Sequence, residues 1–174
     1  ENQVLIIGAT RYENNKYYNS LINITSSNVT YFDKKILVPF GEFLPLRDLL
    51  FFLESIVGPN NYSKGNIERI ISLPDNTSFI PVICYEIVFY WKLLNKLNIN
   101  SNFIVNITND FWFGEYLGPY QHFYLTKIRA AEFNKPIVRV SNNGISAIIN
   151  NNGRVLINTE LNKSENFKHK LLLQ

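Results

Sequence analysis

Short apolar runs separated by polar turns make up most of the chain, and they predict a protein built largely from buried strands. Residues 4–8, 79–84 and 103–107 are mainly apolar stretches of strand length, a pattern typical of strands that are covered on both faces. Residues 18–25 alternate between apolar and polar positions after a polar turn, which predicts a second strand paired in a hairpin. The other expected strands are residues 36–38, 67–73, 137–140, 145–149 and 155–159.

Helices are expected at residues 46–57, 87–97 and 119–133. In the first of these, apolar residues recur at helical spacing and Pro45 suits the helix start. The dipeptide Gly58-Pro59 ends it, and Pro136 stops the last helix. Strands and helices alternate in the middle of the chain, and the final strands follow one another around a turn at residues 150–153. This order predicts an α/β protein with a mixed sheet.

Composition and charge exclude several classes of function but say less about the fold. The 174 residues suit one domain, and the net charge of +3 comes without any basic run, so no nucleic-acid partner is expected. No stretch reaches the roughly 18 consecutive apolar residues of a membrane span. Two histidines and one cysteine make no convincing zinc site, and we expect neither a metal nor another cofactor. Methionine is absent even at position 1, so we expect a piece of a larger protein.

Candidate chemistry gathers at three places where an expected strand ends. Cys84, the only cysteine, closes one apolar run and precedes an expected helix, whose N-terminal amides would favour the reactive thiolate. Lys34 and Glu42 flank a second, short apolar stretch, and residues 106–114 form a strand that runs into a polar loop. A single cysteine on an apolar strand is, taken alone, more often an inert core residue. The three segments together predict one site.

Five segments resemble, in order and spacing, the nitrilase-like domain of bacterial apolipoprotein N-acyltransferases: KKILVPFGEFLP (34–45), CYEI (84–87), NITNDFWFG (106–114), GPYQHF (118–123) and RVSNNGIS (139–146). The glutamate after Cys84 and Tyr85 is specific to this branch, because ordinary amidases of the superfamily usually have an aspartate there. The resemblance implies a nitrilase-like α-β-β-α sandwich whose N-terminal part is missing. We expect this partial domain at residues 1–160 and a polar tail at residues 161–174.

The resemblance also implies a role for each site residue. Cys84 matches the nucleophile that carries the acyl group, and Lys34 matches the lysine that stabilises the thiolate and the developing oxyanion. Lys35 is the competing neighbour, but the spacing of eight residues to Glu42 selects Lys34. Glu42 matches a glutamate that orients the lysine or assists proton transfer. The residues expected to line the site are Tyr85, Glu86, Asn109, Asp110 and Trp112. His122 is expected to be a hydrogen-bonded structural residue.

The activity implied by the resemblance is N-acyl transfer in lipoprotein maturation. A phospholipid would donate the acyl group, and the α-amine of a diacylglyceryl-cysteine at a lipoprotein's N-terminus would accept it. Such enzymes lie in the bacterial inner membrane with this domain facing the periplasm, and membrane contact would come from segments outside this chain. The family's first glutamate, its general base, is expected upstream of residue 1. Its loss costs a factor of about 10²–10⁴, so we expect this chain alone to be nearly inactive.

Two other functions stay open on the sequence. One is a soluble amidase that cleaves a small amide with the same kind of triad. The other is a non-catalytic relic of a split gene. The CYE triplet and the LVPFGE segment favour the acyltransferase over the amidase.

Overall fold

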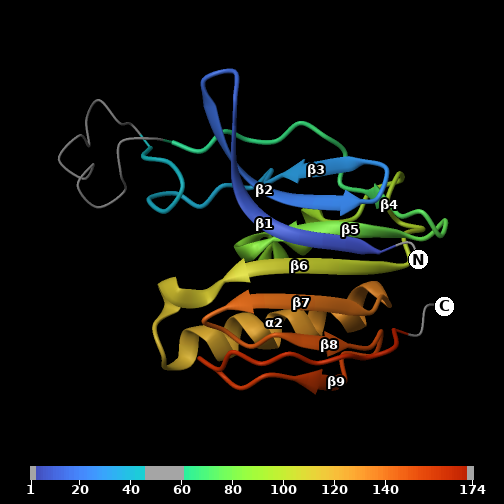
Figure 1. The fold of residues 1–174 in the computed structure, drawn as a ribbon. Coiled ribbons are helices and arrows are strands. Elements are labelled where there is room, and N and C mark those ends of the chain that lie inside the picture. Colours follow the sequence, from blue (N-terminus) through green and yellow to red (C-terminus); the bar gives the residue numbers. More distant parts are fainter. Residues whose placement is uncertain (1–2, 46–60, 172–174) are drawn as a thin grey trace.

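Two β-sheets form the body of the protein in the computed structural model, which describes residues 3–45 and 61–171 (Figure 1). The smaller sheet is antiparallel and has the order β1-β2-β3. The larger sheet has the order β4-β5-β6-β7-β8-β9, in which β5, β6 and β7 are parallel neighbours and the outer pairs are antiparallel. The strands are β1 (Val4–Glu13), β2 (Lys16–Thr25), β3 (Val29–Asp33), β4 (Ile71–Ser72), β5 (Ser78–Ile83), β6 (Phe103–Asn109), β7 (Ile137–Asn142), β8 (Ala147–Ile149) and β9 (Val155–Asn158).

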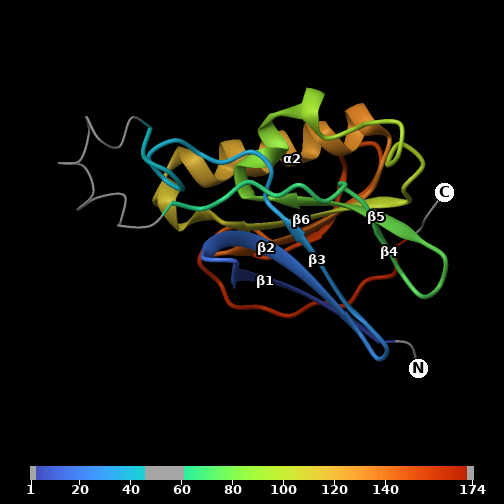
Figure 2. The same ribbon diagram turned by 90° about the horizontal axis from the view of Figure 1, so that it is seen from above.

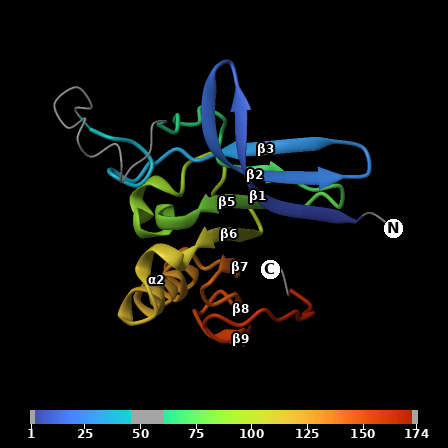
Figure 3. The ribbon, with the colours of Figure 1, turned by 60° about the vertical axis from the view of Figure 1, so that its left-hand side comes forward.

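Strand β5 shows how the layers are held together. Successive side chains of a strand point to opposite faces, and in β5 Phe79 and Ile83 pack with Leu21 and Phe32 of the smaller sheet. The alternate residues Ile80 and Val82 pack in a second cluster that includes Ala130 of helix α2 (Leu117–Phe133). Figure 2 and Figure 3 show the result, with the larger sheet lying between the smaller sheet and α2.

The expected α/β architecture is therefore confirmed. Three of the four layers of the expected sandwich, β, β and α, lie in the described ranges. Within those ranges no helix packs on the outer face of the smaller sheet. In the described residues no helix has the length and apolar character needed to span a membrane.

The β1–β2 hairpin is longer and more exposed than the apolar pattern predicts. The strands are joined through Glu13 and Lys16 by a turn in which Asn14 and Asn15 both have positive φ, a conformation that asparagine tolerates well. The prediction that residues 4–8 form a buried strand is half wrong. They form a strand, but Leu5 is 56% exposed and Ile7 is 38% exposed, because they alternate with the inward-facing Ile6 and point to the face of the sheet that no described helix covers.

Three other element predictions need correction. Residues 36–38 form no strand, because the backbone N–H groups of Ile36 and Val38 donate to the carboxylates of Glu86 and Glu42 instead of to a neighbouring strand. Residues 87–97 form no α-helix; short 3₁₀ turns occupy Cys84–Val88 (η2) and Tyr90–Lys92 (η3). The strand expected at 67–73 shortens to β4. The helix expected at 46–57 lies outside the described residues.

The hairpin turn at 150–153, the long helix and the last strands are confirmed. α2 ends at Asn134, which adopts the left-handed conformation as its C-cap two residues before Pro136. Gly153 has a φ of 78° in the turn between β8 and β9. The parallel strands β5 and β6 are followed directly by η2 and by η4 (Asp110–Phe113). The carboxyl ends of parallel strands meet at one edge of a sheet, which is where α/β proteins place their ligands.

Gly65 is the glycine at which we expect substitution to disturb this arrangement. Its backbone N–H donates to the carbonyl of Lys34, and a Cβ at this position would come within 2.2 Å of the Asp33 carbonyl oxygen. We expect Gly65→Ala to lower the free energy of unfolding by about 1–3 kcal/mol, because backbone must move to admit the methyl group. Gly41→Ala is the control, since its Cβ would meet only ordinary contacts with Val38. Equal denaturant midpoints for the two variants would contradict the prediction.

Candidate active site

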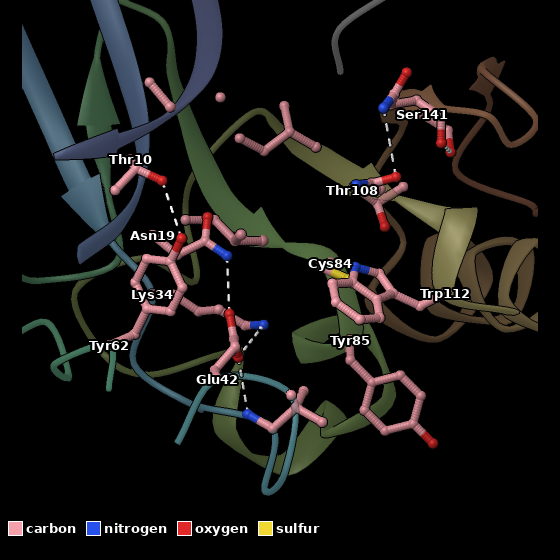
Figure 4. Close-up of a pocket in the computed structure, with 18 of the residues that line it drawn as sticks. Thr10, Asn19, Lys34, Glu42, Tyr62, Cys84, Tyr85, Thr108, Trp112 and Ser141 are labelled. Atoms are coloured by element: carbon pink, nitrogen blue, oxygen red, sulfur yellow. Dashed lines mark hydrogen bonds and ion pairs between the residues drawn. The ribbon is translucent and has the colours of Figure 1, made fainter. Parts of the chain in front are cut away.

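A cavity of about 1180 Å³ opens between the two sheets at the carboxyl ends of β5 and β6. Residues of both sheets and of the connecting segments line it, and apolar side chains from β1, β6 and β7 form much of its wall. Figure 4 shows Asn19, Lys34 and Glu42 on one side of the cavity and Cys84 with Trp112 on the other. Of the sequence-predicted site residues, the cavity is lined by Lys34, Glu42, Cys84, Tyr85, Asn109 and Trp112.

Cys84 stands at the sharp turn where β5 ends and η2 begins. Its φ is 51°, a left-handed conformation that costs a residue with a Cβ of order 1–3 kcal/mol unless surrounding contacts impose it. Strain of this kind is concentrated at functional sites. The side chain is half-buried, free of any disulfide and part of the cavity wall. The turn therefore exposes the thiol at the rim of the sheet.

Lys34 forms a buried ion pair with Glu42 in the cavity wall. Its Nζ donates to Glu42 Oε2 at 2.7 Å, and the lysine side chain is only 1% exposed. The Glu42 carboxylate also accepts the Val38 N–H at 2.8 Å and the Asn19 Nδ2 at 2.8 Å. A cation held this firmly is oriented before any substrate arrives. The neighbouring Lys35 is not part of the cavity wall, so the selection of Lys34 agrees with the geometry.

Asn19 is a site residue that the sequence reasoning missed. It lies on β2, lines the cavity and fixes the second oxygen of Glu42. The only sign of it in the sequence is the polar pair Asn19-Ser20 within an expected strand, and such a pair more often indicates solvent-exposed positions. Tyr62 also lines the cavity, and its hydroxyl lies 3.0 Å from that of Thr10.

Glu86 lies beneath the cavity instead of lining it, contrary to the expectation from the CYE triplet. It is 0% exposed and forms a bidentate pair with Arg69. Burial by itself would raise the pKa of its carboxyl group, but the hydrogen bonds and charge of Arg69 and the backbone amides outweigh burial, and the pKa is lowered. Glu86 is therefore an ionised internal anchor. Tyr85 does reach the cavity, although its ring points away from Lys34 and Glu42 (Figure 4).

Asp110 is the second predicted lining residue that lies behind the wall. Its carboxylate accepts from Arg139 at 2.6 Å and from Ser141 at 3.0 Å, and it pairs with His122 Nδ1 at 2.8 Å. Burial favours the neutral form, yet the His122 hydrogen bond and the charge of Arg139 prevail, so the pKa of Asp110 is lowered. Because an ionised carboxylate only accepts, His122 Nδ1 carries the proton. The His122 Nε2 atom has no hydrogen-bond partner in the described ranges.

This network supports the loop that closes one side of the cavity. Asp110 opens η4, and the Asn109 side chain caps the same turn by accepting from the Phe111 N–H at 3.2 Å. The turn holds Trp112 in the cavity wall, although the residue is 75% exposed. Within residues 3–45 and 61–171, no three His, Cys, Asp or Glu side chains come together as metal ligands would.

Asp110→Asn should reveal the cost of breaking this network. We expect it to lower the free energy of unfolding at pH 7 by about 3–5 kcal/mol, because the buried guanidinium of Arg139 would lose the carboxylate that balances its charge. The folded-state pKa of Asp110 is depressed, so its stabilisation is complete above about pH 4 and is lost as the pH falls through the folded-state pKa.

Urea unfolding at pH 7 and at pH 3.5 measures both effects. The variant should lose less stability than the parent on acidification. Glu165→Gln, at an exposed position after the last strand, is the control and should leave stability at pH 7 nearly unchanged. An Asp110→Asn protein as stable as the parent at pH 7 would overturn this account of the network.

Comparison with known proteins agrees with this geometry. A sequence profile of the carbon–nitrogen hydrolase family matches residues 1–166. The chain is 41% identical to the apolipoprotein N-acyltransferase of Allorhizobium ampelinum over 173 residues, which are 93% of this chain and 33% of that protein. It is 40% identical to the apolipoprotein N-acyltransferase of Brucella suis over 166 residues, covering 89% of this chain and 31% of that protein. The chain thus spans about a third of the length of these curated relatives.

Solved structures show the same fold at low sequence identity. XC1258 from Xanthomonas campestris, a CN-hydrolase superfamily protein, superposes with a TM-score of 0.67 at 17% identity over 92% of this chain and 60% of that chain. Nit3 from Saccharomyces cerevisiae, a member of the nitrilase superfamily, gives a TM-score of 0.63 at 16% identity over 91% of this chain and 55% of that chain. The chain belongs to the carbon–nitrogen hydrolase family, and its similarity to apolipoprotein N-acyltransferases confirms the resemblance that its motifs predicted.

Proposed function

We propose that this chain is part of the catalytic domain of a lipoprotein N-acyltransferase. The observation that carries the proposal is the placement of Cys84 and the Lys34–Glu42 pair in one large cavity with an extensive apolar wall. The cavity exceeds the range of about 300–1,000 Å³ that is usual for drug-sized ligands. That size and lining suit a long acyl chain better than a small amide. The names of the relatives support the same reaction class.

The first half-reaction forms a thioester on Cys84. The thiolate attacks the ester carbonyl of a phospholipid, and the negative charge that develops on the carbonyl oxygen is stabilised by the Lys34 ammonium. The carbon–oxygen bond of the ester then breaks, and the leaving alkoxide takes up a proton and departs as a lysophospholipid. The acyl group stays activated because a thioester is more reactive than the amide that follows.

The second half-reaction transfers the acyl group to an amine. The α-amine of a diacylglyceryl-cysteine at a lipoprotein's N-terminus attacks the thioester carbonyl. The carbon–sulfur bond breaks, the Cys84 thiolate returns and the amine nitrogen loses a proton. Glu42 holds Lys34 in place through both steps.

The isolated chain should be slow in this chemistry. Glu42 is the single carboxylate that lines the cavity in the described residues, and it is already bonded to Lys34, Val38 and Asn19. A thiol without a free general base forfeits a factor of about 10²–10⁴. We therefore propose that the full activity belongs to a longer protein, in the bacterial inner membrane with this domain facing the periplasm. Membrane contact there would come from segments outside this chain.

Intact mass spectrometry after incubation with phosphatidylethanolamine vesicles tests the acyl-enzyme. We expect a mass increase of one acyl group that hydroxylamine releases, slowly on this chain and faster on the chain extended on both sides to the length of its relatives. Cys84→Ala is the control and should give no adduct. An adduct that survives Cys84→Ala, or none on either protein, would contradict the proposal. Ammonia released from a small amide instead would indicate an amidase, and neither product would indicate a relic.

Lys34→Met tests the proposed oxyanion stabilisation. Loss of one such donor typically costs about 10²–10³ in rate, and we expect thioester formation on the extended protein to slow by that order. Lys35→Met is a matched control, because its side chain is absent from the cavity wall and should leave the rate within about twofold. The time course of adduct formation measures both variants. Equal slowing in the two would rule out a specific role for Lys34.

A further inference from the structure

The Glu86 carboxylate receives five N–H donors from three separate parts of the chain. Oε1 accepts the backbone N–H groups of Lys35 at 2.9 Å and Ile36 at 3.1 Å, and Oε2 accepts that of Ile83 at 3.0 Å. The guanidinium of Arg69 supplies the other two, at 2.7 Å and 2.8 Å. A buried carboxylate needs this degree of compensation to remain charged.

These backbone contacts lie beside the two reactive side chains. Lys35 directly follows Lys34, and Ile83 directly precedes Cys84. One carboxylate group therefore joins the segment that carries the lysine to the strand end that carries the thiol. The distance and orientation between Lys34 and Cys84 depend on where this carboxylate sits.

Arg69 fixes the position of the Glu86 carboxylate. The guanidinium is buried and pairs with both oxygens of Glu86, and it also donates to the Pro81 carbonyl of β5 at 2.8 Å. Its carbon lies 4.8 Å from the centre of the Phe32 ring of β3. The backbone carbonyl of Arg69 accepts the Asn98 side chain at 3.0 Å. Both sheets thus hold this guanidinium, and its planar fork holds the carboxylate in one orientation.

We infer that Arg69 is a positioning residue of the active site, which acts through Glu86 to fix where Lys34 lies relative to Cys84 across the cavity. The catalytic meaning of this inference rests on the proposed function, whereas the placement itself can be tested without any acyl donor. Arg69 lies outside the cavity wall and 15 residues before Cys84 in the sequence, so it contacts no substrate there.

The test uses the alkylation rate of Cys84 by iodoacetamide, which reports on this residue alone because the chain has one cysteine. Lys34 lines the same cavity as Cys84, and a cation that faces a thiol makes it more reactive, so a misplaced Lys34 should slow alkylation. We expect a decrease of about tenfold in Arg69→Met and a smaller decrease in Arg69→Lys, which keeps the charge but loses the bidentate geometry. Ile149→Val, in the core at β8, is the control for lost stability and should alkylate at the parent rate. Thermal melting identifies the variants that fold.

A double-mutant cycle with Lys34→Met separates positioning from general loosening. If Arg69 acts by placing Lys34, then Arg69→Lys should change the alkylation rate by less than about twofold once Lys34 is Met. Multiplicative effects of the two substitutions, or a parent-like rate in a folded Arg69 variant, would overturn the inference. Should Arg69→Met fail to fold, Arg69→Lys alone decides the cycle. If the alkylation rates change as expected but no acyl adduct forms, the result would count against the proposed acyl transfer and leave the positioning role intact.

Discussion

The Glu86 carboxylate is charged and fully buried, and the geometry of the site follows from the hydrogen bonds that stabilise this charge. The cost of removing a carboxylate from water is several kcal/mol, so every lone pair needs a donor. The donors come from the segment after Lys34, from the strand end before Cys84 and from Arg69. Because one rigid group binds all three, none of these segments can move without breaking a buried hydrogen bond. The strained turn at Cys84 is held by the same contacts.

A second buried acid, Asp110, fixes the opposite side of the cavity in the same way that Glu86 fixes the segments beneath it. The charge of the Asp110 carboxylate is balanced by the Arg139 guanidinium, and Asp110 opens the turn that carries Trp112. In both pairs neither the carboxylate nor its arginine is part of the cavity wall. These internal charges are balanced within their own networks. Among the described residues that line the cavity, Lys34 is the cation, with Glu42 as its partner.

The apolar parts of the cavity come from the same strands that build the core. In β6, Ile104 packs toward α2, whereas Val105 and Ile107 pack toward the smaller sheet, and Ile107 also lines the cavity. The cavity is thus a continuation of the space between the two sheets. Such a site offers apolar surface along its length and polar groups at the sheet edge. This distribution suits the proposed substrate, a long acyl chain with a reactive ester at one end.

The sequence alone determined the strands with strong local signals, the long helix and the hairpin turns. It also identified the cavity residues that lie in family motifs, Cys84, Lys34 and Glu42 among them. These features depend on neighbours in the chain, so local pattern and short motifs carry them. Only the tertiary structure decided that residues 36–38 bind a carboxylate instead of forming a strand. It also decided that Asn19 lines the cavity, and that Glu86 and Asp110 lie behind its wall, paired with Arg69 and Arg139. The contacts Ile36–Glu86, Asn19–Glu42, Arg69–Glu86 and Arg139–Asp110 join residues that are 17 to 50 positions apart along the chain, where no local periodicity records them.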